Sequence, residues 1–162
     1  MRGEPKQEKE ESKMAKNVSA IVFRLTKIGD GRTTEELVRA GNYNYANSDI
    51  NSANFPVRSM KRCVREIVFL EFDHGVTSEE AIAEAEKQEL ERPIYEDALY
   101  FGVEHPDVQC ERPVVFLHEP WRDPLGSRSI LYLWGNADYR RLYLDYFGRR
   151  WGRDCRFAFV RK

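Results

Sequence analysis

The sequence predicts an α+β domain, and three observations favour this class. The first is the uninterrupted apolar run Ile67–Leu70, which is typical of a strand covered on both faces. The second is a helix-start pattern, a threonine followed three residues later by a glutamate, at Thr33 and Thr77. The third is an alternation of apolar and polar residues in 130–162, the pattern of half-buried strands. This mixed order of strands and helices is that of an α+β domain.

The length and composition indicate one globular domain. The 162 residues are 41% hydrophobic and 12% aromatic, as in folded proteins. No apolar run approaches the roughly 20 residues that a membrane span needs. The N-terminus lacks the apolar stretch of a signal peptide, so a cytoplasmic location is expected. Residues 1–16 are rich in lysine and glutamate and are expected to be a disordered lead, followed by a single domain over 17–162.

The first half of this domain is expected to begin with an interior strand. Val18–Leu25 is apolar on both faces, as in strands with a neighbour on each side. Thr33 then caps a short helix, with Glu36 completing a capping box, and Gly41 ends it.

Residues 41–56 form a long polar loop. Five asparagines lie between Asn42 and Phe55, and their side chains can bond to the backbone around them. A loop of this length is either functional or wraps the domain. Wrapping is favoured, with Ile50 and Phe55 as the apolar anchors.

The middle of the chain contains the predicted helices. Glu66–Asp73 is expected to be a central strand, and Thr77 starts a helix that runs to about Leu90. A second helix follows Pro93 and spans Ile94 to about Val103. Pro113–His118 is the next strand, and a polar loop follows it.

The last part of the chain, Ile130–Lys162, alternates between two sets of residues. One set is apolar and is expected to face the core: Leu131, Leu133, Leu142, Leu144, Phe147, Cys155, Phe157 and Phe159. The other is aromatic, polar or charged and is the candidate ligand surface: Tyr132, Trp134, Asn136, Asp138, Tyr139, Arg141, Tyr143, Asp145, Tyr146, Arg149, Arg150, Arg153 and Asp154. Aromatic residues give large rigid contact areas, and Asn, Asp and Arg give adaptable polar contacts. The terminal strand Cys155–Val160 should pair inside the sheet, since an exposed apolar edge promotes aggregation.

The charges are unevenly distributed along the chain. Residues 66–111 hold 14 acidic and 2 basic residues, whereas residues 139–162 hold 8 basic and 2 acidic ones. Either the two segments attract each other across the fold, or the basic end binds an anionic ligand. Attraction within the fold is favoured, because Asp138, Asp145 and Asp154 interrupt the basic segment.

These patterns resemble the variable proteins of diversity-generating retroelements, which use the C-type lectin fold, and in particular their archaeal type. The resemblance covers about Arg65–Lys162. It is carried by the strand, helix, helix, strands order from Glu66 and by the C-terminal Cys-Arg-Phe-Ala-Phe-Val-Arg-Lys. It is also carried by the preceding run of Tyr, Trp, Asn, Asp, Arg and Gly between regularly spaced apolar residues.

The resemblance implies two helices packed on antiparallel sheets with long ordered loops. It also implies a variable region at about 130–155, whose exposed side chains bind a protein or another macromolecule. The chain departs from sugar-binding C-type lectins, because Trp134-Gly135-Asn136 is not their Trp-Asn-Asp pattern. A calcium and sugar site is therefore not expected.

Arginines and aromatic residues interleave in 139–153, including Arg140 and Trp151, so single-stranded nucleic-acid binding is the alternative. The near-neutral net charge of -1 opposes it.

Enzyme chemistry is not indicated. The three histidines and three cysteines have no zinc-ligand spacing, and no glycine-rich phosphate loop occurs, so no cofactor, metal or catalytic residue is expected. Structural roles are expected for His74, His105 and His118. Reduced, buried thiols are expected for the cysteines, whose number is odd and whose spacing is unpaired.

Overall fold

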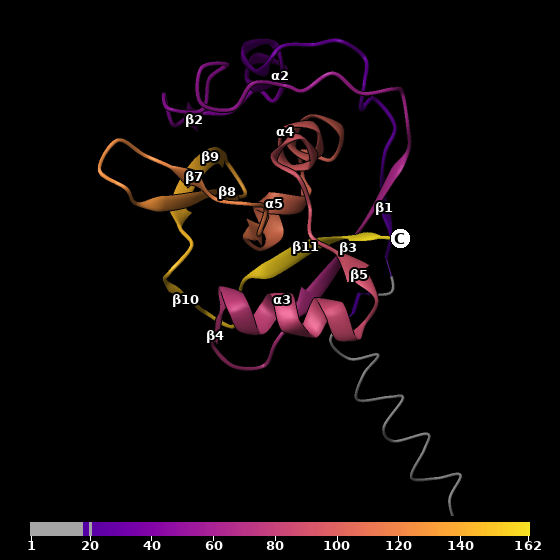
Figure 1. Cartoon of the computed structure of the whole chain (residues 1–162), viewed down its shortest axis with the longest axis vertical. Coiled ribbons are helices and arrows are strands. Elements are labelled where there is room, and N and C mark those ends of the chain that lie inside the picture. The colour runs from indigo at the N-terminus through magenta and orange to yellow at the C-terminus, as the bar shows by residue number, and fades with distance from the viewer. Residues whose placement is uncertain (1–17, 20) are drawn as a thin grey trace, which may run out of the picture.

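The computed structural model describes residues 18–19 and 21–162, and Figure 1 shows the arrangement of their helices and strands. The predicted disordered lead, residues 1–16, lies outside the described residues. The helices are α2 (Thr34–Ala40), α3 (Ser78–Lys87), α4 (Tyr95–Glu104) and α5 (Val108–Glu111). The strands are β1 (Phe23–Leu25), β2 (Tyr45–Ala46), β3 (Arg65–Glu71), β4 (Val76–Thr77), β5 (Leu90–Glu91), β6 (Val114–Val115), β7 (Trp121–Arg122), β8 (Arg128–Asn136), β9 (Tyr139–Tyr146), β10 (Arg150–Trp151) and β11 (Arg156–Arg161).

The α+β class is confirmed, but two of its expected details are wrong. The resemblance implied two helices packed on the sheets, whereas the described residues contain four, among them the short helix expected after Thr33. The main sheet has nine strands in the order β1-β3-β11-β6-β8-β9-β2, with β5 beside β11 and β7 beside β8. This sheet is mixed, since β11 runs parallel to β6 and β2 runs parallel to β9. The small two-stranded sheet pairs β10 with β4.

The centre of the sheet is the antiparallel pair β3–β11. Phe157 lies opposite Leu70, and Phe159 lies opposite Val68, so the expected internal pairing of the terminal strand is confirmed. Helices cover both faces of this pair: the side chains of α4 pack in one apolar cluster and those of α3 in the other. Figure 1 shows α4 and α3 on opposite sides of β3 and β11. Cover on both faces explains the uninterrupted apolar sequence of β3.

The expected interior position of Val18–Leu25 is wrong. Among its described residues only Phe23–Leu25 forms a strand, β1, which lies at the edge of the sheet beside β3. The side chains of Phe23 and Leu25 pack in the α4 cluster, whereas Arg24 between them is exposed. Val22 packs against the α3 cluster. The apolar residues of this segment therefore reflect contact with the two clusters and not a neighbouring strand on each side.

Local signals place the predicted helix starts correctly. The hydroxyls of Thr33 and Thr77 accept the backbone N–H of Glu36 and Glu80, and both capping boxes are complete. Helix α3 ends at Lys87, earlier than expected, because Glu89 adopts a φ of 59° and the chain turns into β5. Helix α5 and the short strand β7 were not expected.

The loop over residues 41–56 wraps the domain and also adds a strand to it. Ile50 and Phe55 are the expected anchors, with 4% and 1% of their surface exposed. Between them and α2, strand β2 pairs in parallel with β9, so that Tyr45 lies opposite Arg141. This contact brings the N-terminal half of the chain to the C-terminal hairpin, as the neighbouring positions of β2 and β9 in Figure 1 also show.

All three cysteines are free, as expected, but they are not all buried. Cys155 is buried, Cys110 is partly buried and Cys63 is exposed. Burial raises the pKa of the Cys155 thiol to about 11, so that thiol stays protonated at neutral pH. Within the described residues, none of the helices combines the length and the apolar character that crossing a membrane requires.

His118 connects the core to strand β8 as a neutral imidazole. Its Nε2 accepts the backbone N–H of Leu131 at 2.9 Å, and its Nδ1 lies 2.8 Å from the carbonyl of Glu119, to which it donates. Burial lowers the pKa of His118 to about 4 from an ordinary value of 6.5. The unfolded chain therefore binds a proton between these two pKa values that the folded protein does not bind.

This difference predicts a loss of stability as the pH falls through that window. Between pH 7 and pH 5, His118 is expected to lower the free energy of unfolding by about 2 kcal/mol. Urea denaturation at several pH values measures this, and His118→Gln should remove that part of the pH dependence. An equal slope in the wild-type protein and in the His118 variant would contradict the prediction.

Candidate functional site

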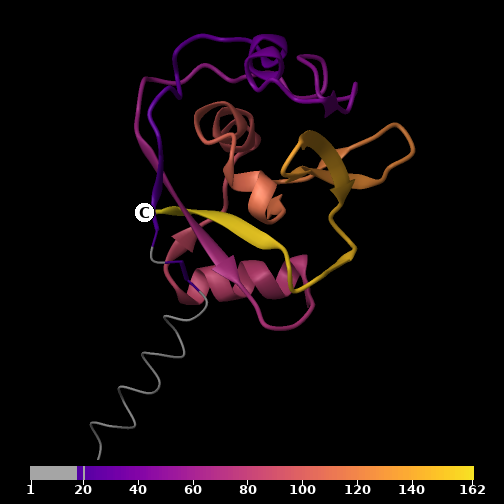
Figure 2. The ribbon, with the colours of Figure 1, turned by 180° about the vertical axis from the view of Figure 1, so that it is seen from behind.

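The β8–β9 hairpin separates the two sets of residues that alternate along its strands. Side chains directly opposite each other in an antiparallel pair lie on the same face. Leu131 lies opposite Leu144, and Leu133 lies opposite Leu142; all four pack in the α4 cluster. The residues between them lie on the other side of the hairpin. There Ile130, opposite Asp145, is buried in the α3 cluster. The remaining side chains of that side, here called the hairpin face, are Tyr132, Trp134, Asn136, Tyr139, Arg141, Tyr143 and Asp145. The hairpin lies on the side of the molecule away from the C-terminus in both views (Figures 1 and 2).

Arg141 occupies the middle of the hairpin face. The carbon atom of its guanidinium lies 4.5 Å from the ring centroid of Tyr139, 5.3 Å from that of Tyr143 and 5.4 Å from that of Trp134. It also donates a hydrogen bond to the hydroxyl of Tyr143. Cation–π contacts of this kind favour a fixed, partly desolvated guanidinium. These four residues thus form an ordered aromatic and cationic patch.

Tyr45 extends this patch and was missed from the sequence. Its ring lies 5.5 Å from that of Tyr143, and 45% of its surface is exposed. It comes from β2 in the asparagine-rich loop, whose composition was unusual but whose position on the sheet was not predictable. Tyr45 is therefore a candidate ligand contact from outside the 130–155 region.

At the other end of the hairpin face, side chains pack against the core. The ring of Tyr132 packs 5.9 Å from that of the buried Trp151, and burial raises the pKa of the Tyr132 hydroxyl. Asp145 pairs with Arg149 at 2.5 Å, and the Arg149 guanidinium lies 4.7 Å from the Trp151 ring centroid. Tyr132 thus contributes to packing as well as to the surface. Its replacement should cost more stability than replacement of a fully exposed side chain.

Six of the predicted site residues lie off the hairpin face or at its margin, and one of them is Arg149, which pairs with Asp145. Asp138 lies in the turn between β8 and β9, and Arg153 and Asp154 lie in the turn before β11. Tyr146 is 59% exposed, but its alternation along β9 sets it with Leu144 and not with Tyr143. Arg150 donates to the carbonyl of Gly75 in the small sheet at 2.8 Å. The predicted surface is therefore narrower than 130–155.

Two polar side chains, the buried Gln109 and the partly buried Arg140, hold the hairpin in place. The side-chain amide of Gln109, in α5, donates to the carbonyls of Trp134 at 2.9 Å and Arg141 at 3.1 Å, one on each strand. Its carbonyl oxygen accepts from Arg140 at 3.0 Å. The Arg140 guanidinium donates further to the backbone carbonyls of Pro106 at 2.9 Å, Gly102 at 2.8 Å and Gly41. Gln109 and Arg140 are positioning residues, and neither was identified from the sequence.

Two of the residues on which the nucleic-acid alternative rests are not available to a ligand at the surface. Arg140 is directed into the molecule, and Trp151 is fully buried, with its Nε1 donating to Ser78 at 2.9 Å. Stacking on bases requires exposed rings, and binding phosphate requires free cations. The remaining hairpin arginine, Arg141, lies on a face that also carries Asp145.

Histidines and carboxylates in the described residues form no cluster of three or more metal-binding groups. His105 lies 2.8 Å from the carbonyl of Arg24, and His118 is bonded at both ring nitrogens. His74 pairs with Asp73 at 2.7 Å on the surface.

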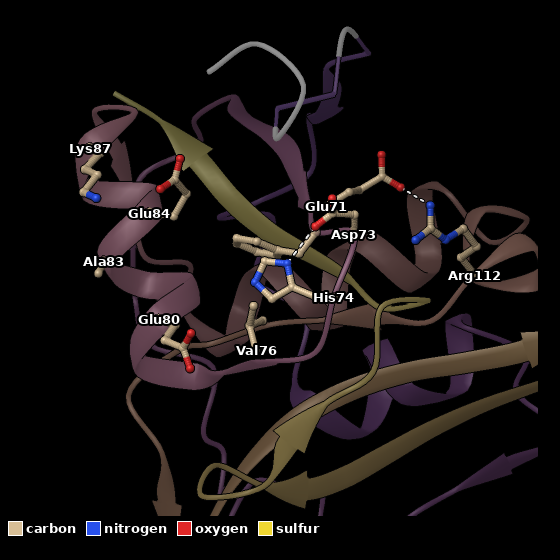
Figure 3. A pocket seen from close by; sticks show the side chains of 10 residues that line it. Glu71, Asp73, His74, Val76, Glu80, Ala83, Glu84, Lys87 and Arg112 are labelled. Carbon is tan, nitrogen blue, oxygen red and sulfur yellow. Dashed lines mark hydrogen bonds and ion pairs between the residues drawn. The ribbon is translucent and has the colours of Figure 1, made fainter. Parts of the chain in front are cut away.

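That pair lines a separate open hollow of about 850 Å³ beside α3, shown in Figure 3. Its walls include Glu71, Glu80 and Glu84, together with Lys87. Figure 3 shows the Asp73–His74 pair and the Glu71–Arg112 pair as two separate contacts on its rim. The histidine and its carboxylate have no nucleophile beside them in this lining, so the hollow shows no acid–base triad.

The fold and this surface define an α+β domain with a mixed sheet and an ordered aromatic face on its C-terminal hairpin. Comparisons with protein-family models, with curated proteins and with solved structures find no match to this chain.

Proposed function

We propose that this protein is a ligand-binding protein that displays changeable side chains on a C-type lectin-like scaffold, as variable proteins of diversity-generating retroelements do. Its ligand is a protein or another macromolecule. The observation that carries the proposal is the division of the β8–β9 hairpin. One face is buried leucine, and the other presents tyrosine, tryptophan, asparagine, aspartate and arginine.

The order of elements supports the scaffold. Strand β3 is followed by α3, α4 and then strands β6 to β11, which is the order on which the resemblance rests. The first strand of this series, β3, pairs with the last, β11, so the chain segment that contains the hairpin is held together at its two ends. Gln109 and Arg140 fix the hairpin through backbone carbonyls, and such contacts are insensitive to the outward side chains.

The composition of the face favours a protein ligand over a nucleic acid. Four of its seven residues are tyrosine or tryptophan, and such residues dominate binding energy at protein interfaces. Its single arginine is accompanied by Asp145, and the whole chain has a net charge of -1. A polyanion would meet little net attraction there. Trp134 and Tyr143 are the expected hot spots of this face, whereas Tyr146 lies on the other side of β9.

Paired libraries test the division between scaffold and display. In one library the codons of Trp134, Arg141 and Tyr143 are randomised, and in the other those of Leu131, Leu133 and Leu142. Most members of the first library should resist proteolysis, because surface substitutions usually change stability by about 0.5 kcal/mol or less. Most members of the second should be degraded, because loss of a core leucine costs about 2 to 5 kcal/mol. Selection of the first library against a chosen target protein should then yield binders.

Equal resistance of the two libraries to proteolysis would contradict the proposed function. So would a first library that stays folded but gives no binder to any of several unrelated targets. The flanking DNA provides an independent check, in which a near-copy of the codons for Leu131–Lys162 should differ only at adenines and lie beside a reverse-transcriptase gene.

A further inference from the structure

Arg141 is a partly buried cation without an anionic partner among the described residues. Within that part of the chain, the only hydrogen bond of its side chain goes to the Tyr143 hydroxyl, and its Nε is buried with no acceptor. No carboxylate of the described residues lies within ion-pair distance of it, although Asp145 is two pairs away along the same face. A guanidinium has five N–H donors, so most of its hydrogen-bonding capacity is unused.

The neighbouring arginines of the C-terminal segment are used differently. Arg149 pairs with Asp145, and Arg156 donates to the carbonyl of Val108 at 2.9 Å and lies 3.7 Å from Glu111. Arg140 is bonded to four internal acceptors. Arg141 therefore differs from these three, because its guanidinium has neither a carboxylate partner nor a set of backbone acceptors among the described residues.

The aromatic rings around Arg141 stabilise its charge but do not satisfy its donors. Ring faces attract a cation through their quadrupole, whereas the N–H groups lie in the guanidinium plane and need lone pairs. A partly desolvated charge without such partners carries a free-energy cost that a bound anion would offset. The free donors of the Arg141 guanidinium can therefore bind an acceptor that comes from outside the chain.

We infer that Arg141 binds a carboxylate of a polypeptide ligand, and that Tyr45, Trp134 and Tyr143 contact the apolar part of the group that carries it. The inference rests on the proposed function and names the chemistry of its ligand. A carboxylate matches the planar guanidinium with two parallel hydrogen bonds. One arginine close to Asp145 suits a single negative charge better than a chain of phosphates.

The proposed carboxylate site depends only partly on residues 130–155, because Tyr45 also belongs to it. It belongs to the asparagine-rich loop and is held by the parallel pairing of β2 with β9. Its exposed ring borders Tyr143, so one wall of the subsite comes from each half of the chain. Replacement of Tyr45 is therefore expected to weaken binding without any change in residues 130–155.

The carboxylate can be an aspartate or glutamate side chain or the C-terminus of a polypeptide, and two pairs of probes separate these sources. The first pair is N-acetyl-tyrosine and N-acetyl-tyrosinamide, which differ in a terminal carboxylate. The second is the α-amide of N-acetyl-glutamate and N-acetyl-glutaminamide, which differ in a side-chain carboxylate. Each is titrated into the ¹⁵N-labelled full chain while the Arg141 Nε–H resonance and the backbone amides of β2 and β9 are followed by NMR.

At least one carboxylate probe should give a saturable shift at Arg141 and β2, and its amide partner should bind about tenfold or more weakly, as expected for loss of one charge-assisted pair. Arg141→Gln should abolish the difference between the two members of a pair. Arg153→Gln is the matched control, because Arg153 is an exposed arginine of the same segment that lies off the hairpin face, and it should leave the titration unchanged. Tyr45→Ala should reduce the affinity for the carboxylate probe.

Equal shifts from a carboxylate and its amide, or the same titration in Arg141→Gln, would overturn the inference. Tighter binding of inorganic phosphate or of a short single-stranded oligonucleotide at Arg141 would also overturn it, in favour of the nucleic-acid alternative. These failures differ from failure of the proposed function, which is decided by the survival of the two hairpin libraries and not by any carboxylate.

Discussion

Replacing Arg140 with alanine is expected to lower the free energy of unfolding by about 3 to 5 kcal/mol. The change removes the donors for three backbone carbonyls and for the side chain of Gln109, and each unsatisfied buried acceptor costs about 1 to 3 kcal/mol before relaxation. It also removes the cation that lies 4.7 Å from the ring centroid of Tyr43. Chemical denaturation with a tyrosine or tryptophan fluorescence readout measures the loss.

Arg141→Ala is the matched control for this prediction. The two arginines are adjacent in sequence, but alternation along β9 sets them on opposite faces of the hairpin. Arg141→Ala should change stability by less than about 1 kcal/mol, since it removes one side-chain hydrogen bond and its ring contacts at the surface. Comparable losses in the two variants would show that the hairpin is not fixed through Arg140.

Replacing Trp151 with alanine is expected to cost about 3 to 5 kcal/mol, as for other fully buried tryptophans. The indole fills the α3 cluster, where it packs 6.3 Å from the ring of Phe157 and 5.9 Å from that of Tyr132. Its Nε1 donates to the hydroxyl of Ser78, which in turn donates to the carbonyl of Phe147 at 2.6 Å. Thermal and urea denaturation should both show the loss.

Trp134→Ala provides the comparison with the same residue type on the hairpin face. Trp134 is partly exposed and contacts Arg141, so its loss should cost about 1 kcal/mol or less. Trp151→Phe should fall between the two, because it keeps part of the ring packing and loses the bond to Ser78. A Trp134 variant as unstable as the Trp151 variant would contradict the division between scaffold and display.

Those parts of the fold that local sequence determines were predictable. The capping boxes at Thr33 and Thr77 involve residues three apart, and their hydrogen bonds follow from that spacing. The continuous apolar sequence of β3 likewise predicted a strand that is covered on both faces. The alternation in β8 and β9 correctly separated Leu131, Leu133 and Leu142 from their neighbours, and this separation defines the candidate face.

The unpredicted parts depend on contacts between distant segments. Nothing near Tyr45 in the sequence indicates that it pairs with β9, because β2 is two residues long and its partner lies at the other end of the domain. Arg140 and Arg141 are chemically identical, and only the position of the carbonyls of Gly41, Gly102 and Pro106 gives them different roles. Tyr146 was assigned to the candidate ligand surface from its residue type; it is exposed, but the register of β9 sets it on the face opposite that of Tyr143.

The pairing of β3 with β11 has a practical consequence for any binding assay. It brings Lys162 to the side of the molecule away from the β8–β9 hairpin, as both views of the ribbon show (Figures 1 and 2). A tag, bead or carrier joined after Lys162 would therefore attach on the side away from the hairpin. Immobilisation through Lys162 should leave the hairpin free to meet a ligand.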